Sequence, residues 1–272
     1  MKNKTILVTG ATDGIGKQTA LELVRTGARV LIHGRDKEKG ARVLSELNHA
    51  SCNENLALYI ADFSSLADVR RMSEEIKREQ SELHVLVNNA GNFYKEKLLN
   101  EDGLEMTLVV NHLAPFLLTR LLLDLLKASA PARVVMVASG AHRNLKQIDW
   151  DNLQGEKAYD GYDAYALSKL ANICYINELA HRLTGSGVTA NSLHPGVIDT
   201  KLLHSIYDME GASVEEGAQT SVFLATAQEV EGVSGRYFSR MVEKPISDLA
   251  RDTDVRHKFW ELSEKLVAKY LD

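Results

Sequence analysis

A tyrosine and a lysine stand four residues apart in the stretch Tyr165-Ala-Leu-Ser-Lys169. Apolar residues follow at helical spacing, so we expect this stretch to open a long helix. Positions four apart share one face of a helix, which lets the phenol and the ammonium point into the same space. A phenol has a reference pKa of about 10, and a fixed cation beside it lowers that pKa. The pair is a candidate acid–base for proton transfer. The alternative is two surface side chains on a solvated helix.

A glycine-rich turn is the second candidate. It follows an apolar run at 5–9, precedes a helical pattern that ends near Gly27, and has the sequence Gly10-Ala-Thr12-Asp13-Gly14-Ile15-Gly16. Glycines let a backbone approach a pyrophosphate, and the helix N-terminus supplies free N–H groups and a positive dipole end. We therefore expect this loop to bind a dinucleotide. The alternative is a tight turn without a ligand.

The end of the next predicted strand, 28–33, indicates which dinucleotide binds. It leads into Gly34-Arg35-Asp36, where a dinucleotide fold recognises the adenosine ribose. A carboxylate there would bind the 2′-hydroxyl, whereas the guanidinium of Arg35 suits a 2′-phosphate. The pattern favours NADP(H), with NAD(H) possible, and Lys17 could add positive charge. Asp36 precedes a helical pattern and is expected to cap that helix.

The alternation of strands and helices continues along the chain. Strands are predicted at 56–60, 83–87, 133–137, 188–193 and 235–238, and helices at 65–80, 103–127, 165–184, 215–226 and 253–270. Ser65 and Asp68 are spaced as a capping box, and Asn111 and Pro115 inside one helix predict a bend. The fold class is α/β: one doubly wound, Rossmann-type domain over 1–272, with about seven mainly parallel strands and helices on both faces. The apolar loop at 197–212 is a candidate substrate lid.

Composition excludes several classes of protein. A formal net charge of −5 gives no electrostatic footprint for nucleic acid. Cys52 and Cys174 are far apart and do not resemble a disulfide framework, so a reducing, cytoplasmic location is the default. The most apolar run, 116–126, is too short and too charged to span a bilayer, and no signal peptide is visible at the start. We expect no metal, no nucleic-acid partner and no membrane span.

Several short motifs occur in one order along most of the chain. These are Thr9-Gly10-x-x-x-Gly14-x-Gly16, Asn88-Asn89-Ala90-Gly91, Asn111, Ser139, Tyr165-x-x-x-Lys169 and Pro195-Gly196. In this order they resemble the short-chain dehydrogenase/reductase family. The passages at 34–36, 110–113, 151–157, 168–172, 194–197 and 234–239 are similar to its retinol-dehydrogenase-like branch.

The resemblance implies a role for each motif residue. Tyr165 would give a proton to a carbonyl oxygen, Lys169 would lower the pKa of Tyr165 and bind the nicotinamide ribose, and Ser139 would donate to the same oxygen. Asn111 would hold a water that links Lys169 to solvent. The resemblance also implies further cofactor contacts. Asp62 and Phe63 would lie at the adenine, and Asn89, Ala90 and Gly91 along the adenosine and ribose. Val197 and Thr200 would lie near the carboxamide, with Pro195 and Gly196, which precede them in the sequence, as additional contacts.

The expected function is hydride transfer between NADP(H) and an alcohol/carbonyl pair, with reduction of a lipophilic aldehyde or ketone. The expected pocket walls are Phe93, Tyr94, Leu145, Trp150, Tyr162 and Leu203. Two alternatives are a dinucleotide-sensing regulator without chemistry and a sugar-nucleotide epimerase or dehydratase on a related fold. The intact set of Ser139, Tyr165 and Lys169 argues against the regulator, and the short C-terminal portion argues against the epimerase. Relatives often pair through the helices that carry Asn111 and Tyr165, so a homodimer or homotetramer is possible.

Overall fold

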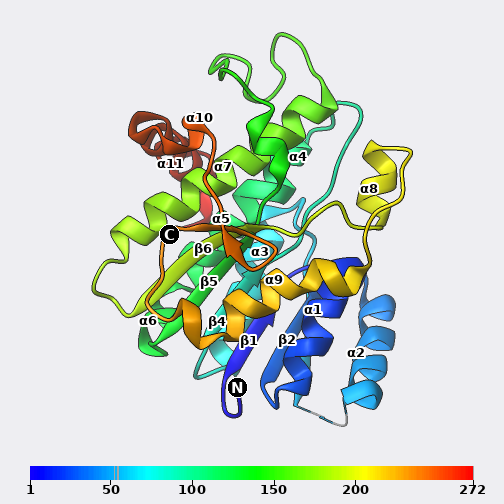
Figure 1. The fold of residues 1–272 in the computed structure, drawn as a ribbon. Coiled ribbons are helices and arrows are strands. Elements are labelled where there is room, and N and C mark those ends of the chain that lie inside the picture. The colour runs from blue at the N-terminus through cyan, green and yellow to red at the C-terminus, as the bar shows by residue number, and fades with distance from the viewer. Residues whose placement is uncertain (52, 54, 272) are drawn as a thin grey trace.

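An eight-stranded sheet organises the described part of the chain, residues 1–51, 53 and 55–271 of a computed structural model (Figure 1). The strand order is β3-β2-β1-β4-β5-β6-β7-β8. The strands are β1 (Thr5–Val8), β2 (Arg29–Gly34), β3 (Leu56–Ile60), β4 (Val85–Asn88), β5 (Ala132–Val137), β6 (Val188–His194), β7 (Tyr237–Ser239) and β8 (Val242–Glu243). The first seven are parallel, and β8 adds a two-residue antiparallel strand beside β7. The predicted sheet of about seven mainly parallel strands is thus confirmed, with one short addition.

Two hydrophobic cores lie on the two faces of this sheet. Successive side chains of a strand point to opposite faces. In β1, Ile6 and Val8 belong to one buried cluster, whereas Leu7 belongs to the other. Because both faces are covered, β1 and β4 are largely apolar rather than alternating with polar residues.

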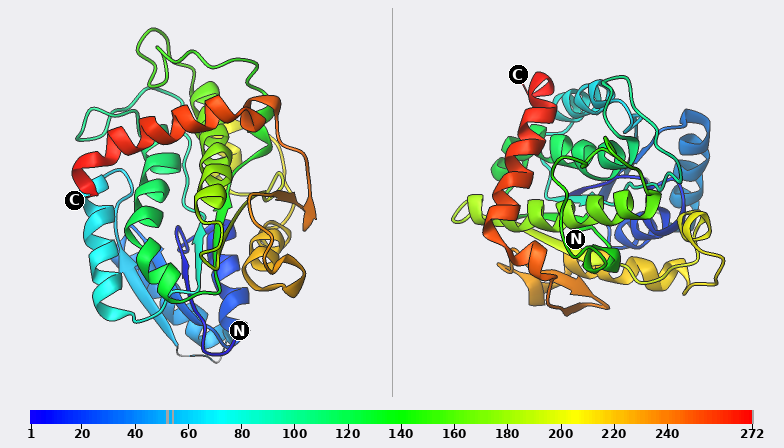
Figure 2. Two further views of the ribbon diagram at one scale, coloured as in Figure 1. Left: turned by 90° about the vertical axis from the view of Figure 1, so that its left-hand side faces the viewer. Right: turned by 90° about the horizontal axis from the view of Figure 1, so that it is seen from above.

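Helices supply the outer layers. They are α1 (Gly14–Arg25), α2 (Lys37–Ser51), α3 (Leu66–Glu79), α4 (Met106–Leu108), α5 (Ala114–Leu121), α6 (Leu123–Ala128), α7 (Gly161–Arg182), α8 (Lys201–Ile206), α9 (Val214–Thr226), α10 (Asp248–Arg251) and α11 (Thr253–Val267). Helices α1, α2 and α9 pack against the face that receives Ile6, and α3, α5 and α7 pack against the face that receives Leu7. Helix α11 lies outside α7 and α5 (Figure 2).

The predicted helix over 103–127 is divided in the structure. A π-helical turn, η1 (Val109–Leu113), stands between α4 and α5, and α5 ends one residue before α6 begins. The expected bend is therefore present, with Asn111 inside the π-turn. Pro115 has no N–H, so it cannot donate to the carbonyl four residues earlier, that of Asn111. The side-chain amide of Asn172 on α7 donates to that carbonyl at 2.9 Å.

Two predicted helix starts are confirmed. The Asp36 carboxylate accepts the Lys39 amide at 2.9 Å, and the Ser65 hydroxyl accepts the Asp68 amide at 3.3 Å. Both contacts satisfy N–H groups that the first turn of a helix leaves without a backbone partner. Three short 3-10 turns, η2 (Gly140–Arg143), η3 (Gln228–Val230) and η4 (Ala268–Tyr270), join the remaining elements.

Two further expectations concern cysteine and the membrane. Cys174 is a free, buried thiol. Cys52 lies outside the described residues, so its predicted lack of a disulfide partner stays a prediction. Within the described residues, no helix combines the length and the apolarity that a bilayer crossing requires.

Candidate active site

A cleft of about 800 Å³ opens at the carboxyl ends of the strands. The chain builds the sheet outward from β1 in one direction and from β4 in the other, and ligands of such sheets bind where the order reverses. Most of the predicted site residues line the cleft: Gly10, Thr12, Asp13, Gly14, Ile15, Gly16, Arg35, Asp62, Phe63, Asn89, Ala90, Gly91, Tyr165, Lys169, Pro195 and Thr200. One surface thus collects residues that are far apart in the sequence.

The glycine-rich turn is braced against the end of β4. Gly10 has φ +63°, and a Cβ there would stand 2.9 Å from the Ala90 Cα. The Asn89 side-chain amide donates to the Thr9 carbonyl at 2.8 Å, and the Thr9 hydroxyl accepts the Ala90 amide at 3.0 Å. A Cβ at Gly16 would stand 2.2 Å from the Gly10 carbonyl oxygen. Glycine is therefore required at both positions for steric reasons, which keeps the start of α1 open to the cleft.

An ionic cluster sits at the start of α1. Asp13 caps that helix through the Gly14 amide, and its carboxylate contacts the ammonium groups of Lys201 at 2.8 Å and Lys39 at 2.6 Å. Hydrogen bonds from Lys201 and then Lys39 hold the pKa of Asp13 well below its usual range. Lys17, expected to add positive charge, instead pairs with Glu46 at 2.5 Å. Asp13 thus places a negative charge beside the helix N-terminus, and two lysines compensate it.

His33 joins the glycine-rich turn to the end of β3 at one side of the cleft, a role that sequence analysis missed. Its Nδ1 accepts the Gly10 amide at 3.1 Å, and its Nε2 lies 3.0 Å from the Ala61 carbonyl. Since a carbonyl can only accept, Nε2 carries the proton and Nδ1 is the acceptor. The ring stacks on Phe63 at 4.2 Å, and burial lowers the pKa of His33 to about 4. The available signal was a histidine directly after the apolar run Val30-Leu31-Ile32 of β2.

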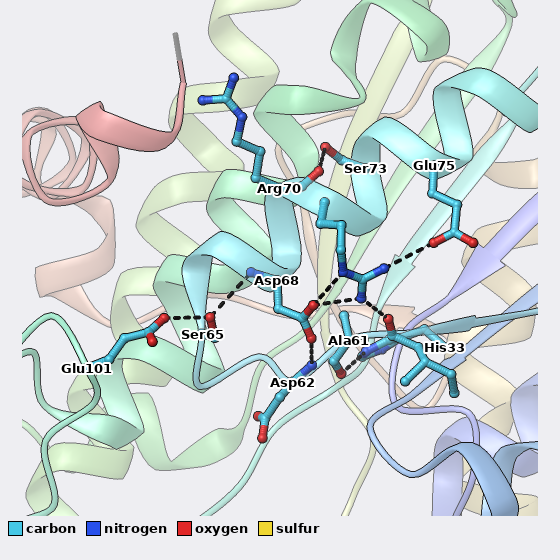
Figure 3. A network of polar contacts seen from close by, with 11 residues as sticks. His33, Ala61, Asp62, Ser65, Asp68, Arg70, Ser73, Glu75 and Glu101 are labelled. Carbon is cyan, nitrogen blue, oxygen red and sulfur yellow. Dashed lines mark hydrogen bonds and ion pairs between the residues drawn. The ribbon is translucent and has the colours of Figure 1, made fainter.

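Asp62 is held at the end of β3 by its backbone. The Asp68 carboxylate accepts the Asp62 amide at 2.6 Å, and Arg71 donates to Asp68 and to the Ile60 carbonyl. Figure 3 shows the Asp62 carboxylate turned away from Asp68. The predicted capping box is therefore half formed: Ser65 caps α3, whereas Asp68 bonds the strand end that precedes it.

Tyr165 and Lys169 both face the cleft from α7 and are 7% and 3% exposed. The Lys169 Nζ lies 5.4 Å from the centre of the Tyr165 ring and donates to the Val137 carbonyl at 3.3 Å. Burial raises the pKa of Tyr165 to about 12, and a hydrogen bond with Ser139 opposes that shift. Burial also lowers the pKa of Lys169 to about 8. The expected lowering of the Tyr165 pKa is thus not found: the pKa is raised, because desolvation outweighs the hydrogen bond with Ser139.

Asn111 and Ser139 complete the predicted catalytic set without lining the cleft themselves. Asn111 is 1% exposed; its Oδ1 accepts the Asn92 amide at 2.7 Å, and its Nδ2 donates to the Ser168 hydroxyl at 3.1 Å. A Cβ at Gly91 would stand 3.3 Å from both the Asn111 Oδ1 and the Lys169 Nζ, so both groups face this glycine. Ser139 follows Ala138, which lines the cleft, and hydrogen-bonds Tyr165. The structure thus brings all four residues together.

The predicted pocket walls are only partly placed at the cleft. Tyr94 lines it, and the Phe93 ring stands 6.3 Å from the Tyr165 ring. Trp150 instead packs on Phe259 of α11 at 5.0 Å, and Leu145 joins the same cluster. Tyr162 and Leu203 do not line the cleft: Tyr162 stands beside it against Tyr207, at 6.0 Å, and Leu203 is buried. The apolar residues that line the cleft include Val110, Val137 and Leu202.

The segment at 197–212 closes on itself beside the cleft. The Asp199 amide donates to the Ala212 carbonyl, and the Ala212 amide donates to the Val197 carbonyl, each at 2.8 Å. Helix α8 within this segment brings Thr200 and Lys201 to the cleft. Thr200 caps α8, and a Cβ at Gly14 would stand 3.4 Å from its methyl group.

Two predicted cofactor contacts in this region do not line the cleft. Val197 is 48% exposed and, like Gly196, is absent from the lining. Gly196 has φ +106°, a conformation that L side chains rarely adopt. The chain turns sharply between Pro195 and α8, which carries Val197 to the surface while Thr200 returns to the cleft.

Comparisons with known proteins agree with this geometry. Residues 4–211 match a family model described as short chain dehydrogenase. Retinol dehydrogenase 14 of Mus musculus is 41% identical over 290 residues, which cover 98% of this chain and 86% of that protein. A solved structure of an uncharacterized protein from Mycobacterium paratuberculosis superimposes with a TM-score of 0.80 at 30% identity, covering 98% of this chain and 94% of that one. The Pseudomonas aeruginosa RhlG/NADP active-site complex does so with a TM-score of 0.72 at 27% identity, covering 88% and 94%.

Proposed function

Because the chain belongs to the short-chain dehydrogenase family, in its retinol-dehydrogenase-like branch, we propose that it uses NADP(H) to reduce a lipophilic aldehyde or ketone. Family membership makes it an oxidoreductase acting on an alcohol/carbonyl pair. The carrying observation is that Asn111 and Lys169 meet at Gly91, and that Tyr165 lines the same cleft as the glycine-rich loop. A proton donor and a dinucleotide-binding loop thus border the same space.

The residues at the end of β2 fit a 2′-phosphorylated cofactor. A Cβ at Gly34 would stand 2.4 Å from the Thr12 methyl group, so this position resists a side chain and hence a carboxylate that would repel the phosphate. Arg35 lies next to it on the cleft and is exposed. Its planar guanidinium suits a phosphate. The relative whose structure is titled an NADP complex supports the same choice.

The side chains act on the carbonyl oxygen. When bound, NADPH supplies the hydride that reduces the carbonyl carbon. Tyr165 donates its phenolic proton to the oxygen, and Ser139 donates a second hydrogen bond that stabilises the negative charge developing there. Because burial raises the pKa of Tyr165 to about 12, the phenol holds its proton at neutral pH. In that state Tyr165 can act as the proton donor during reduction.

The lining of the cleft supports an apolar substrate. Tyr94, Val110 and Leu202 contribute apolar surface to it. Tyr207 and Met209, in the segment beside the cleft, are 43% and 47% exposed. An apolar molecule in contact with these side chains would remove their surface from water, which is favourable.

We also propose a cytoplasmic location and a homodimer or homotetramer. The free, buried thiol of Cys174 suits a reducing compartment. Helix α11 covers the outer sides of α5 and α7, with Trp260 against Phe116 at 5.3 Å and against Tyr175 at 5.7 Å. A pair formed through this side of the molecule would therefore contact α11.

The test is a cofactor-oxidation screen. The purified protein is mixed with NADPH or NADH and a panel of lipophilic aldehydes, ketones and quinones, and loss of reduced cofactor is followed by absorbance. We expect turnover with NADPH and aliphatic or aromatic carbonyls, and weaker turnover with NADH. If NADPH binds by calorimetry but no compound is reduced, the proposed enzyme function is wrong.

A further inference from the structure

A buried chain of polar side chains joins the π-turn to the C-terminal helix. His112, directly after Asn111 in η1, is 1% exposed, and its Nδ1 lies 3.0 Å from the Asn172 Oδ1. Its Nε2 lies 2.7 Å from the hydroxyl of Ser263 on α11. The Asn172 Nδ2 donates to the Asn111 carbonyl at 2.9 Å. The Asn111 carbonyl is thus the last acceptor in this series of polar groups.

The donors in this chain can be assigned. Asn172 donates through its Nδ2, so its Oδ1 faces His112 as an acceptor and the His112 Nδ1 must carry a proton. Burial lowers the pKa of His112 to about 4, so the ring is neutral at pH 7 and Nε2 is an acceptor. The Ser263 hydroxyl must then donate to Nε2. It also lies 2.7 Å from the Phe259 carbonyl, which can only accept, so the hydroxyl hydrogen is shared between the His112 Nε2 and that carbonyl.

We propose that Ser263, His112 and Asn172 are positioning residues that hold Asn111 in place for the reaction, an inference that rests on the proposed function. The hydrogen bonds run in one direction, from Ser263 through His112 and Asn172 to the Asn111 carbonyl. The Asn111 side chain in turn bonds the Asn92 backbone and Ser168, which fixes its Oδ1 beside Gly91, where the Lys169 Nζ also lies. The C-terminal helix thereby reaches the catalytic set.

Loss of the Ser263 hydroxyl would remove the first hydrogen bond of this series. The His112 Nε2 would then be a buried acceptor without a donor, which is unfavourable. If the ring moved its proton to Nε2, two acceptors would face each other at Asn172. Either change releases the π-turn. Helix α11 would stay seated, because Trp260 packs on Phe116 and Tyr175, and Arg120 pairs with Glu264.

The kinetic test compares Ser263→Ala with a matched control, Ser73→Ala. Ser73 is also a buried helix serine whose hydroxyl donates to a backbone carbonyl, that of Arg70 at 2.7 Å, but it lies on α3. With the full chain, NADPH and the best carbonyl of the screen, we expect Ser263→Ala to lower kcat about tenfold, the scale of one lost hydrogen bond. KM and the Kd for NADPH should change less than twofold, and Ser73→Ala should leave kcat within twofold. Equal kcat values for the two variants would overturn the proposal.

A double-mutant cycle separates positioning from general stability. Asn172→Leu breaks the chain nearer to Asn111, so adding Ser263→Ala to it should lower kcat no further. Multiplicative losses would mean that Ser263 does not act through Asn172. Ser263→Thr, which keeps a hydroxyl, should retain most of the wild-type kcat. A folded Ser263→Thr protein with low kcat would contradict the proposed role of this series of hydrogen bonds.

A readout independent of turnover is the protonation of His112. Nitrogen-15 NMR of the histidine rings should show the neutral Nδ1–H form in the wild type and a changed Nε2 environment in Ser263→Ala. An Nε2–H tautomer in the wild type would refute the assigned direction even in an active enzyme. If the wild type reduces no carbonyl while showing the Nδ1–H form, the proposed function fails and the hydrogen-bond chain stands.

Discussion

The Lys169 ammonium lies 5.4 Å from the centre of the Tyr165 ring, yet it donates its hydrogen bond to the Val137 carbonyl. The two side chains share one face of α7, as a spacing of four residues requires. Desolvation of the buried phenol raises the pKa of Tyr165 to about 12, so Tyr165 keeps its proton at neutral pH.

Replacing Tyr165 with Phe should abolish turnover and preserve cofactor binding. General acid catalysis contributes about 10²- to 10⁴-fold, so kcat should fall by that range. The matched control is Tyr162→Phe, which removes a phenol one helical turn away. Steady-state kinetics and calorimetry of NADPH binding measure the two effects. A Tyr165→Phe variant with unchanged kcat would rule out the acid role.

Arg35→Ala should weaken NADPH binding far more than NADH binding. A hydrogen bond to a charged group contributes ~1.5–3 kcal/mol, which is about one to two decades in Kd. Arg42→Ala is the control, since it removes the same charge from an exposed position on α2. Titration of each variant with both cofactors gives the comparison. Equal weakening for NADPH and NADH would show that Arg35 does not contact the 2′-phosphate.

Asp13→Asn should tighten dinucleotide binding severalfold. Asn caps a helix about as well as Asp, so α1 should keep its start. The change removes a negative charge from the helix N-terminus and releases Lys39 and Lys201 from their ion pairs, leaving more positive charge for an anionic phosphate. The comparison variant is Asp36→Asn, at the cap of α2. Weaker binding by Asp13→Asn would mean that its ion pairs hold the loop in its binding shape.

The free energy of unfolding should fall as the pH drops from about 6.5 toward 4. Burial lowers the pKa values of His33, His112 and His194 to about 4. In this window the unfolded chain binds protons that the folded protein excludes, so stability increases with pH and is lost on acidification. Each histidine contributes a slope of up to about 1.4 kcal/mol per pH unit. Urea unfolding at pH 7, 6 and 5 measures the slope, and a flat profile would contradict it.

Much of the cleft could be predicted because its parts are local patterns attached to strands. The glycine turn after β1, Arg35 after β2 and Asn89 after β4 all follow parallel strands, whose carboxyl ends meet at one edge of a sheet. The caps at Asp36 and Ser65 were predictable for a similar reason, since each bonds an amide only three residues away. The walls of the substrate pocket were harder to predict from the sequence. Trp150 lies within the long connection between β5 and α7, and nothing in its neighbours indicated that it would pack on Phe259.

The sequence by itself determined the main order of strands and helices, the family and the candidate catalytic side chains, because these depend on neighbours within a few residues. The tertiary structure alone decided what distant contacts control. It set the direction of the Tyr165 pKa shift through desolvation, placed His33 between Gly10 and Ala61, and joined His112 to Ser263 across 151 residues. Burial and long-range hydrogen bonds exist only once remote segments have packed together.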